Sequence, residues 1–243
     1  MTAVTSRVGP ADKSSEHRYG CDEHVVCRMD RAILTHILQP GINLAVWRRD
    51  TPDPIAAWLR ACPLEDTPLL SSDIDITVPA VCVPTELAAA VGGQSHCTRV
   101  GVSALAHDAG TLANIVSRIA GNPNVRVRLE WVRERQCAYF HADRIAFRLV
   151  CTYRGAGTEW ISNATAGKLT SPESEPPPSE IHRLVPGDVA IMRGLSRALD
   201  AGPPLKHRSP PADSLTGWRL FLAIDPICSS ERTLATIAPE TFL

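Results

Sequence analysis

The sequence lacks a surplus of charge of either sign, a long apolar run and a recognisable export leader. Its 243 residues include 25 Lys and Arg against 26 Asp and Glu, which gives a formal net charge of -1. A chain so nearly neutral has no overall field that would draw it to nucleic acid or to an anionic membrane, so we expect neither partner. No apolar run approaches the roughly 20 residues that cross a bilayer, and residues 1–19 are polar. We therefore predict a cytoplasmic protein.

A disulfide framework is not indicated either. The eight cysteines are scattered through a chain without an export signal, where thiols stay reduced. The one compact group is Cys21, His24 and Cys27, and no second CxxC or HxxxH completes a set of four zinc ligands. Whether these three residues form a metal site stays open.

The composition allows a proper core, with 44% hydrophobic and 21% charged residues. We expect a disordered arm over residues 1–20 and a single domain over 25–243, of which 25–122 is a mainly helical covering part. Helical spacing of apolar residues covers 30–38, 54–61 and 98–120, and residues 42–47 alternate like a strand. We expect this helical part to pack on the β-rich second half of the chain and to shape or cover the mouth of its barrel.

After Pro123 the pattern changes to that of strands. Apolar and polar residues alternate strictly from Val125 to Trp131, and shorter strand patterns cover 146–153, 159–162, 188–193 and 218–225. Short strands without long helices between them favour an antiparallel sandwich or barrel. The predicted fold class is α+β, with a β core over residues 123–228 that includes a Pro-rich surface loop at 171–180.

A candidate metal site lies within this β-rich half. His141 and Asp143 are two residues apart, so on a strand both side chains would point to the same face. A second histidine, His207, stands just before the last predicted strand. Two imidazoles and one carboxylate on one face of an octahedron leave three positions open, as in non-haem Fe(II) oxygenases. We predict that these three residues bind one metal ion.

Arg219 follows His207 by twelve residues and gives the site a second feature. A guanidinium can hold the remote carboxylate of 2-oxoglutarate in a bidentate ion pair. We therefore predict Arg219 as a cofactor-binding residue, with Tyr153 as a further hydroxyl donor to a bound carboxylate.

Several nearby side chains have alternative interpretations. Cys137 could add a soft fourth ligand and shift the preference towards zinc, but a buried thiol is the simpler interpretation. His182 is an alternative distal ligand. Arg144 and Arg148 could meet an anionic substrate or lie on a solvated face, and Arg208, beside His207 in the sequence, is expected in a structural ion pair.

These segments also resemble a known family. The resemblance to family 1826 of the domains of unknown function runs from about Ile42 to Asp225. It is carried by Phe140-His141-Ala142-Asp143, the run Tyr153 to Trp160, Gly187-Asp188-Val189-Ala190, His207-Arg208-Ser209-Pro210-Pro211 and Arg219 to Asp225. The family is bacterial, has no established activity, and is associated with zinc-responsive gene neighbourhoods and metal-chaperone GTPases. The resemblance thus implies a link to zinc homeostasis and to such GTPases as partners.

More distantly, the same segments are similar to the cupin-like double-stranded β-helix, or jelly roll, of Fe(II)/2-oxoglutarate dioxygenases. That resemblance maps the metal ligands to His141, Asp143 and His207 and the co-substrate arginine to Arg219. The sequence departs from the pattern after Arg219, where Leu220-Phe221 replaces the Ser or Thr that many dioxygenases carry two residues further on.

Three functions are compatible with these residues. The first is an Fe(II)/2-oxoglutarate-dependent dioxygenase that hydroxylates an unidentified small-molecule or protein substrate. The second is a zinc-binding cupin-like protein of metal homeostasis without oxygenase activity. The third is a metal-free scaffold. An arginine placed for a dicarboxylate has no use in a plain zinc store, so the sequence favours the oxygenase.

Overall fold

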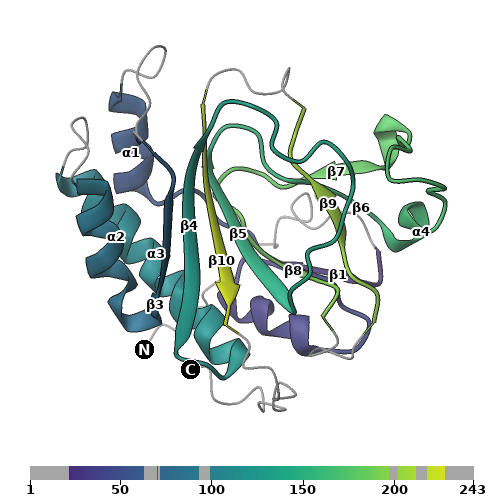
Figure 1. Ribbon diagram of the computed structural model, residues 1–243, viewed down its shortest axis with the longest axis horizontal. Coiled ribbons are helices and arrows are strands. Elements are labelled where there is room, and N and C mark those ends of the chain that lie inside the picture. The colour runs from purple at the N-terminus through teal and green to yellow at the C-terminus, as the bar shows by residue number, and fades with distance from the viewer. Residues whose placement is uncertain are drawn as a thin grey trace, which may run out of the picture.

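The structure is a computed structural model that describes residues 22–62, 70, 72–92, 99–196, 202–211 and 218–227. Figure 1 shows a large twisted sheet between two unlike layers. On one side lie helices α1 (Asp53–Ala61), α2 (Val83–Gly92) and α3 (Arg99–Ala120), and on the other a small sheet. The predicted mixed α+β class is confirmed, whereas the predicted arm at 1–20 lies outside the described residues.

The large sheet has seven strands in the order β1-β2-β8-β5-β10-β4-β3. Its strands are β1 (Val25–Arg28), β2 (Leu44–Trp47), β3 (Ile74–Pro79), β4 (Asn124–Val132), β5 (Phe147–Arg154), β8 (Val189–Arg193) and β10 (Arg219–Pro226). All neighbours are antiparallel except β1 and β2, which are parallel. Three strands thus come from the part predicted to be mainly helical, and the sequence pattern indicated only β2 among them.

The small sheet has the order β7-β6-β9, with β6 (Glu159–Ile161) between β7 (Ile181–Arg183) and β9 (Lys206–Arg208). A single bridge joins His141 to His207 of β9 and so adds one more chain segment to its edge. The remaining described helices are short: the 3-10 helices Arg31–Leu38, Ala80–Cys82 and Pro178–Glu180, and α4 (Asn163–Ala166).

Local signals account for several of these boundaries. The Asp30 side chain accepts a hydrogen bond from the Ala32 amide and caps the 3-10 helix that the sequence predicted as a helix over 30–38. Pro54 lies in the first turn of α1, where its missing N–H costs nothing. Gly121, with φ +62°, ends α3 in the left-handed conformation that glycine adopts without strain.

Two hydrophobic cores follow from the alternation of side chains along the large sheet. On its outer face, β5 and β10 direct Leu149 and Leu222 against α1–α3. On its inner face, β2 and β8 direct Leu44 and Met192 against Trp160 of the small sheet. Polar residues of β4, β5 and β10 share this inner face, so the candidate site lies between the two sheets.

The helices therefore do not shape the mouth of the site. They cover the outer face of the large sheet (Figure 1). None of the described residues between 25 and 122 lines the cavity that contains His141 and His207. The expectation that the helical part covers this mouth is wrong, because an amphipathic helix packs where the strands present continuous apolar rows, and those rows face outwards. Within the described residues, no helix combines the length and apolarity needed to cross a membrane.

Gly194, at the end of β8, is required for close approach to the segment that carries Asp143. Its amide donates to Ala146 O and the next amide, of Leu195, donates to Asp143 O. A Cβ at position 194 would overlap Ile145 O and lie 2.7 Å from Asp143 O. We expect Gly194→Ala to lower the free energy of unfolding by about 1–3 kcal/mol, the usual cost of overpacking.

Urea unfolding of Gly194→Ala and of Gly92→Ala measures this effect. Gly92 is the matched control, because a Cβ there meets nothing within 4 Å. Equal stability of the two variants would show that the backbone contact at Gly194 is not tight.

We expect His182 on β7 to make folding stability depend on pH. Its ring stacks on Trp160 with centroids 4.3 Å apart. Burial and nearby His24 lower the pKa of His182, while Asp22 opposes them. Below the ordinary histidine pKa the unfolded chain binds more protons than the folded one, so this contribution to stability is present above about pH 6.5 and lost as the pH falls.

We expect His182→Phe, which keeps the stacking, to lose less stability than the wild type between about pH 8 and pH 5.5 in urea titrations. An unchanged pH dependence would contradict this.

Candidate metal centre

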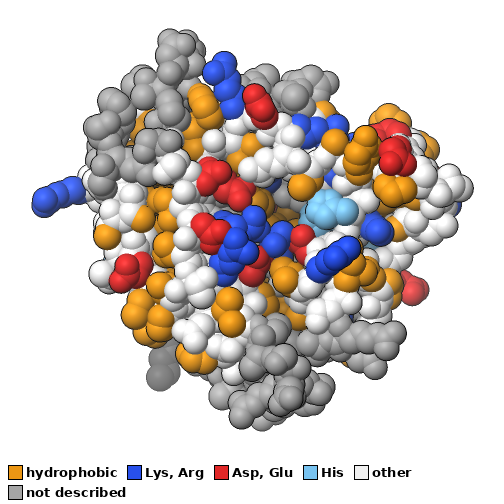
Figure 2. Space-filling view, viewed as in Figure 1, with side chains coloured by type: hydrophobic (Ala, Val, Ile, Leu, Met, Phe, Trp, Pro, Cys, Tyr) orange, Lys and Arg blue, Asp and Glu red, His pale blue; other side chains and the backbone are white. Residues whose placement is uncertain are grey.

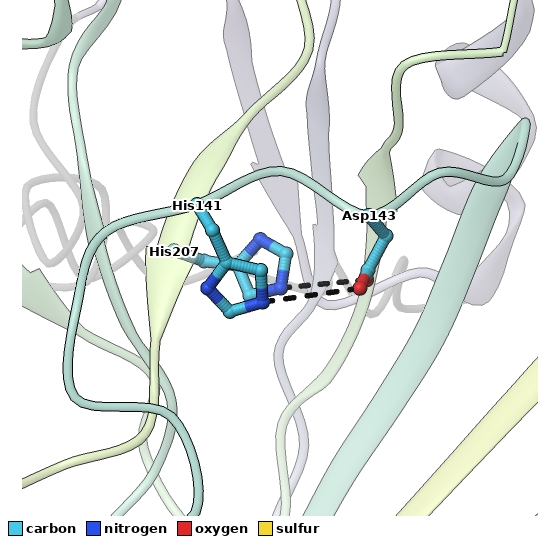
Figure 3. A group of neighbouring side chains, drawn as sticks. All are labelled: His141, Asp143 and His207. Atoms are coloured by element: carbon cyan, nitrogen blue, oxygen red, sulfur yellow. Dashed lines mark ion pairs between the residues drawn. The ribbon is translucent and has the colours of Figure 1, made fainter. Parts of the chain in front are cut away.

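His141, Asp143 and His207 converge on one point, as the sequence predicted that they would. Each offers a ligand atom, and these atoms all lie within 4.8 Å of one another. Figure 3 shows both imidazole rings directed at the Asp143 carboxylate. Asp143 Oδ2 lies 3.4 Å from His207 Nε2, and Asp143 Oδ1 lies 3.9 Å from His141 Nε2. Within the described part of the chain, this is the one group of three such residues.

The local structure differs from the strand that the prediction assumed. His141 and Asp143 lie in the connection between β4 and β5, and only His141 has a strand-like partner. The His141 amide donates to His207 O at 3.0 Å, and the His207 amide donates to His141 O at 2.9 Å. This pair of bonds sets the two rings side by side, with centroids 4.7 Å apart.

Backbone carbonyls fix the tautomer of both histidines. His141 Nδ1 lies 3.0 Å from Tyr139 O, and His207 Nδ1 lies 3.3 Å from Leu205 O. A carbonyl oxygen only accepts, so in each ring Nδ1 carries the proton and neutral Nε2 carries the lone pair. Both Nε2 atoms face Asp143, and a carbonyl on the other nitrogen is the arrangement that commonly orients a metal-binding histidine.

The Asp143 carboxylate is anchored by one oxygen only. Arg148 Nη1 lies 2.9 Å from Oδ1, whereas Oδ2 is buried without a hydrogen-bond donor among the described residues. Burial raises the pKa of Asp143, but its contact with His207 and the charge of Arg148 outweigh burial and lower that pKa to about 2. Asp143 is therefore an anion at neutral pH.

This arrangement fits a divalent cation. The Nε2 lone pairs of His141 and His207 and the buried Oδ2 of Asp143 converge on one place. A proton on either Nε2 would bind Oδ2 but would leave the other Nε2 lone pair without a partner. The donor set is two imidazole nitrogens and one carboxylate oxygen, which suits Fe(II) and also zinc.

Arg219, at the start of β10, faces the same cavity. This cavity has a volume of about 80 Å³ and is also lined by His141 and His207. Arg219 is 2% exposed, and within the described residues no carboxylate lies within ion-pair distance of it. Its Nη2 donates to Thr152 Oγ1 at 3.2 Å and to Thr158 Oγ1 at 3.0 Å, while Nε meets no acceptor in the part of the chain that the structure describes. Burial lowers the pKa of Arg219 to about 10, and the charge of Glu130 partly opposes this.

Tyr153 does not belong to this site, so its prediction as a cofactor-binding residue is wrong. It lies on β5 one residue after Thr152 and therefore on the opposite, outer face of the sheet. There its hydroxyl donates to Asp108 Oδ2 at 2.7 Å, beside Arg49, which pairs with the same carboxylate.

The other candidates are placed as follows. Cys137 lines the cavity but does not join the three-residue group, and His182 stacks on Trp160 away from it. Cys21 lies outside the described residues. His24, its predicted neighbour in a second metal site, uses Nδ1 towards Asn43 and accepts from the Asn163 amide at Nε2.

The two arginines beside the motif also differ in role. Arg208 makes the expected ion pairs, with Glu159 and Glu175. Arg144 is exposed, whereas Arg148 is the clamp on Asp143 described above and also donates two hydrogen bonds to Asp225.

Sequence reasoning missed the specific roles of Arg148, Thr152 and Thr158. Thr152 and Thr158 provide hydroxyls to Arg219 from β5 and from the turn before β6. They supply the hydroxyl contact to Arg219 that Phe221, two residues after Arg219 in the sequence, cannot make. Only the alternation along β5 could have placed Arg148 and Thr152 on the inner face.

Comparison with known proteins gives one family and several distant structures. AviO1 from Streptomyces viridochromogenes Tue57 is similar at 13% identity over 83% of this chain and 99% of its own, with a TM-score of 0.39. A full-length protein of Neurospora crassa, crystallised with alpha-KG and 5-formyluracil, is similar at 12% identity over 83% of each chain, also with a TM-score of 0.39. A Pseudomonas putida prolyl-4-hydroxylase is similar at 13% identity over 80% of this chain and 96% of its own, with a TM-score of 0.37.

No curated protein matches the sequence. The model of DUF1826, described as a protein of unknown function, matches residues 28–225. The chain therefore belongs to the DUF1826 family.

Proposed function

We propose that this chain is an Fe(II)/2-oxoglutarate-dependent oxygenase whose two sheets form a double-stranded β-helix. The strand order supports the fold. Along the chain, β4, the His141 segment, β5, β6, β7, β8, β9 and β10 alternate between the large and the small sheet, with only β6 and β7 consecutive in one sheet. An eight-segment double sheet of this kind is the arrangement expected of a jelly roll, which supports the proposed fold.

The observation that carries the function is that one cavity contains both a set of metal-ligand atoms and a buried arginine. His141, Asp143 and His207 present three ligand atoms to one point, and the buried Arg219 has no carboxylate partner among the described residues. A metal ion with three open positions would bind the three ligands, and a dicarboxylate bound to that ion would reach the arginine with its other carboxylate. When bound together, Fe(II) and 2-oxoglutarate supply chemistry that inserts one oxygen atom of O₂ into a substrate and leaves succinate and CO₂.

The protein residues have separate roles in this proposal. His141 Nε2, His207 Nε2 and Asp143 Oδ2 would hold the ion, and Arg148 keeps the carboxylate oriented by occupying Oδ1. Arg219 would bind the remote carboxylate. Thr158 accepts from Arg219 and still has its own hydroxyl proton to donate, so it can serve the same carboxylate.

A zinc-binding cupin-like protein of metal homeostasis is the second candidate. The three nitrogen and oxygen ligands with an open position also match catalytic zinc sites. This alternative leaves Arg219 without a role, which is why we place it second.

Anaerobic addition of Fe(II) and then 2-oxoglutarate to the metal-free chain tests the proposal. We expect a visible charge-transfer band in the wild type and in His107→Ala, a control at an exposed histidine of α3. We expect no band in His207→Ala. Stoichiometric zinc that Fe(II) cannot replace, with no band, would refute the oxygenase and support the zinc-binding protein.

A further inference from the structure

Glu130 on β4 is a buried acid that the proposed function does not use. It is 7% exposed and lines the cavity that contains His141, His207 and Arg219. Its Oε1 accepts from Arg128 Nη1 at 3.2 Å, and its Oε2 is buried without a donor in the described part of the structure. A buried carboxylate oxygen without a donor is unfavourable, so a ligand that supplies the donor is favoured there.

Arg128, which is paired with Glu130, has hydrogen-bond donors available beside it. Its Nε and Nη2 are buried and have no hydrogen-bond acceptor among the described residues, and Nη2 lies 3.7 Å from Asp225 Oδ2, beyond hydrogen-bond distance. Arg128 also lines the cavity. Glu130 and Arg128 thus present an acceptor and a donor side by side, joined by their own ion pair.

Two other charged residues that line the cavity, Arg148 and Arg208, are already paired, which narrows the charge that the ligand can carry. Arg148 is paired with Asp143 and Asp225, and Arg208 with Glu159 and Glu175. Figure 2 shows acidic and basic side chains gathered together in the middle of this face, beside the histidines. Arg219 is the surplus cation, and the proposed co-substrate would neutralise it.

We infer that Glu130 and Arg128 recognise a zwitterionic substrate, an amino acid or a molecule with the same ammonium and carboxylate groups. The Glu130–Arg128 pair has no net charge. A ligand with one positive and one negative group can therefore bind both side chains without adding an unbalanced charge to the cavity. The ammonium would donate to Glu130 Oε2, and the carboxylate would accept from Arg128 Nε and Nη2. Charge-assisted hydrogen bonds of this kind are about twice as strong as neutral ones. The substrate role rests on the proposed oxygenase function, but the binding pair does not.

Calorimetric titration of the full-length chain with the twenty free L-amino acids, with and without bound Zn²⁺, tests this inference. We expect at least one to bind the wild type, and its N-acetyl and primary-amide derivatives to bind at least about tenfold more weakly. Glu130→Gln should weaken binding of the free amino acid by a similar factor, as should Arg128→Gln. Glu134→Gln and Arg144→Gln, which alter exposed residues, are the matched controls and should bind like the wild type.

A coupling measurement separates recognition from a merely structural role. Acetylating the ligand amine and replacing Glu130 remove the same contact, so the two losses should not add. The primary amide and Arg128→Gln should behave in the same way. Additive losses, or no binding by any of the twenty amino acids, would overturn the inference.

The proposed oxygenase can fail separately from this inference. Amino-acid binding without binding of Fe(II) and 2-oxoglutarate would refute the oxygenase and leave the Glu130–Arg128 site standing. Binding of Fe(II) and 2-oxoglutarate without any amino acid would have the opposite meaning.

Discussion

Replacing His207 with alanine is expected to weaken binding of Fe(II) or Zn²⁺ by at least about 100-fold. Structural metal sites with four protein ligands bind with about 10–16 kcal/mol, so losing one of three ligands is expected to cost on the order of 3 kcal/mol, or about 100-fold. His207 is well suited to this test because its ring is buried, its Nδ1 is held by Leu205 O and its Nε2 faces Asp143. Competition with a chromophoric chelator measures the affinity, and elemental analysis of the purified protein measures the occupancy.

His182→Phe is the matched control for this experiment. His182 also lies in the small sheet and is the alternative distal ligand in the sequence, but its ring stacks on Trp160. Its replacement should leave metal affinity unchanged. If His207→Ala retained full affinity while His182→Phe lost it, the ligand set derived from the geometry would be wrong. Unchanged affinity in both variants would show that neither histidine is a metal ligand, and a wild type that binds no metal would favour a metal-free scaffold.

Much of the β core could be predicted from the sequence because its strands alternate. β4, β5, β8 and β10 fall within one or two residues of their predicted ranges. Their order in the sheet could not be predicted, because β10 lies between β4 and β5 through contacts 66 to 101 residues apart in the chain. β1 was missed because its four residues show no alternation. β3 does alternate, with Ile74, Ile76 and Val78 turned away from solvent, so its pattern could have been recognised in the sequence.

The candidate site shows the same division between local and distant information. His141, Asp143 and His207 could be chosen from their chemistry and order, although His141 and Asp143 lie in a connection rather than on a strand. Tyr153 was misplaced because its hydroxyl chemistry was considered without its position relative to Thr152, and one residue along a strand reverses the face. Thr158 could not be assigned, because its contact with Arg219 spans 61 positions in the sequence.

The second large effect is expected at Arg219, where replacement by methionine should abolish 2-oxoglutarate binding and yet stabilise the free chain. Loss of a bidentate, charge-assisted pair is expected to weaken 2-oxoglutarate binding by about 100-fold or more. Metal affinity should stay unchanged, because Arg219 contacts Thr152 and Thr158 and none of the three ligands.

The gain in stability has a separate cause. Burial lowers the pKa of Arg219 to about 10, which is a folded-state cost to its charge. At 1.36 kcal/mol per pKa unit this cost is roughly 3 kcal/mol. Contacts of Arg219 with Phe221 and the two threonines offset part of it, so we expect a net gain of about 1–2 kcal/mol in urea unfolding.

Arg144→Met is the control for Arg219→Met, because Arg144 is exposed and lies outside the cavity. Calorimetry with 2-oxoglutarate on the metal-loaded chain measures binding. A stabilised variant that no longer binds 2-oxoglutarate would show that the fold keeps a costly buried cation for its ligand. A destabilised variant with unchanged 2-oxoglutarate affinity would instead make Arg219 a structural residue and remove the main argument against a plain zinc site.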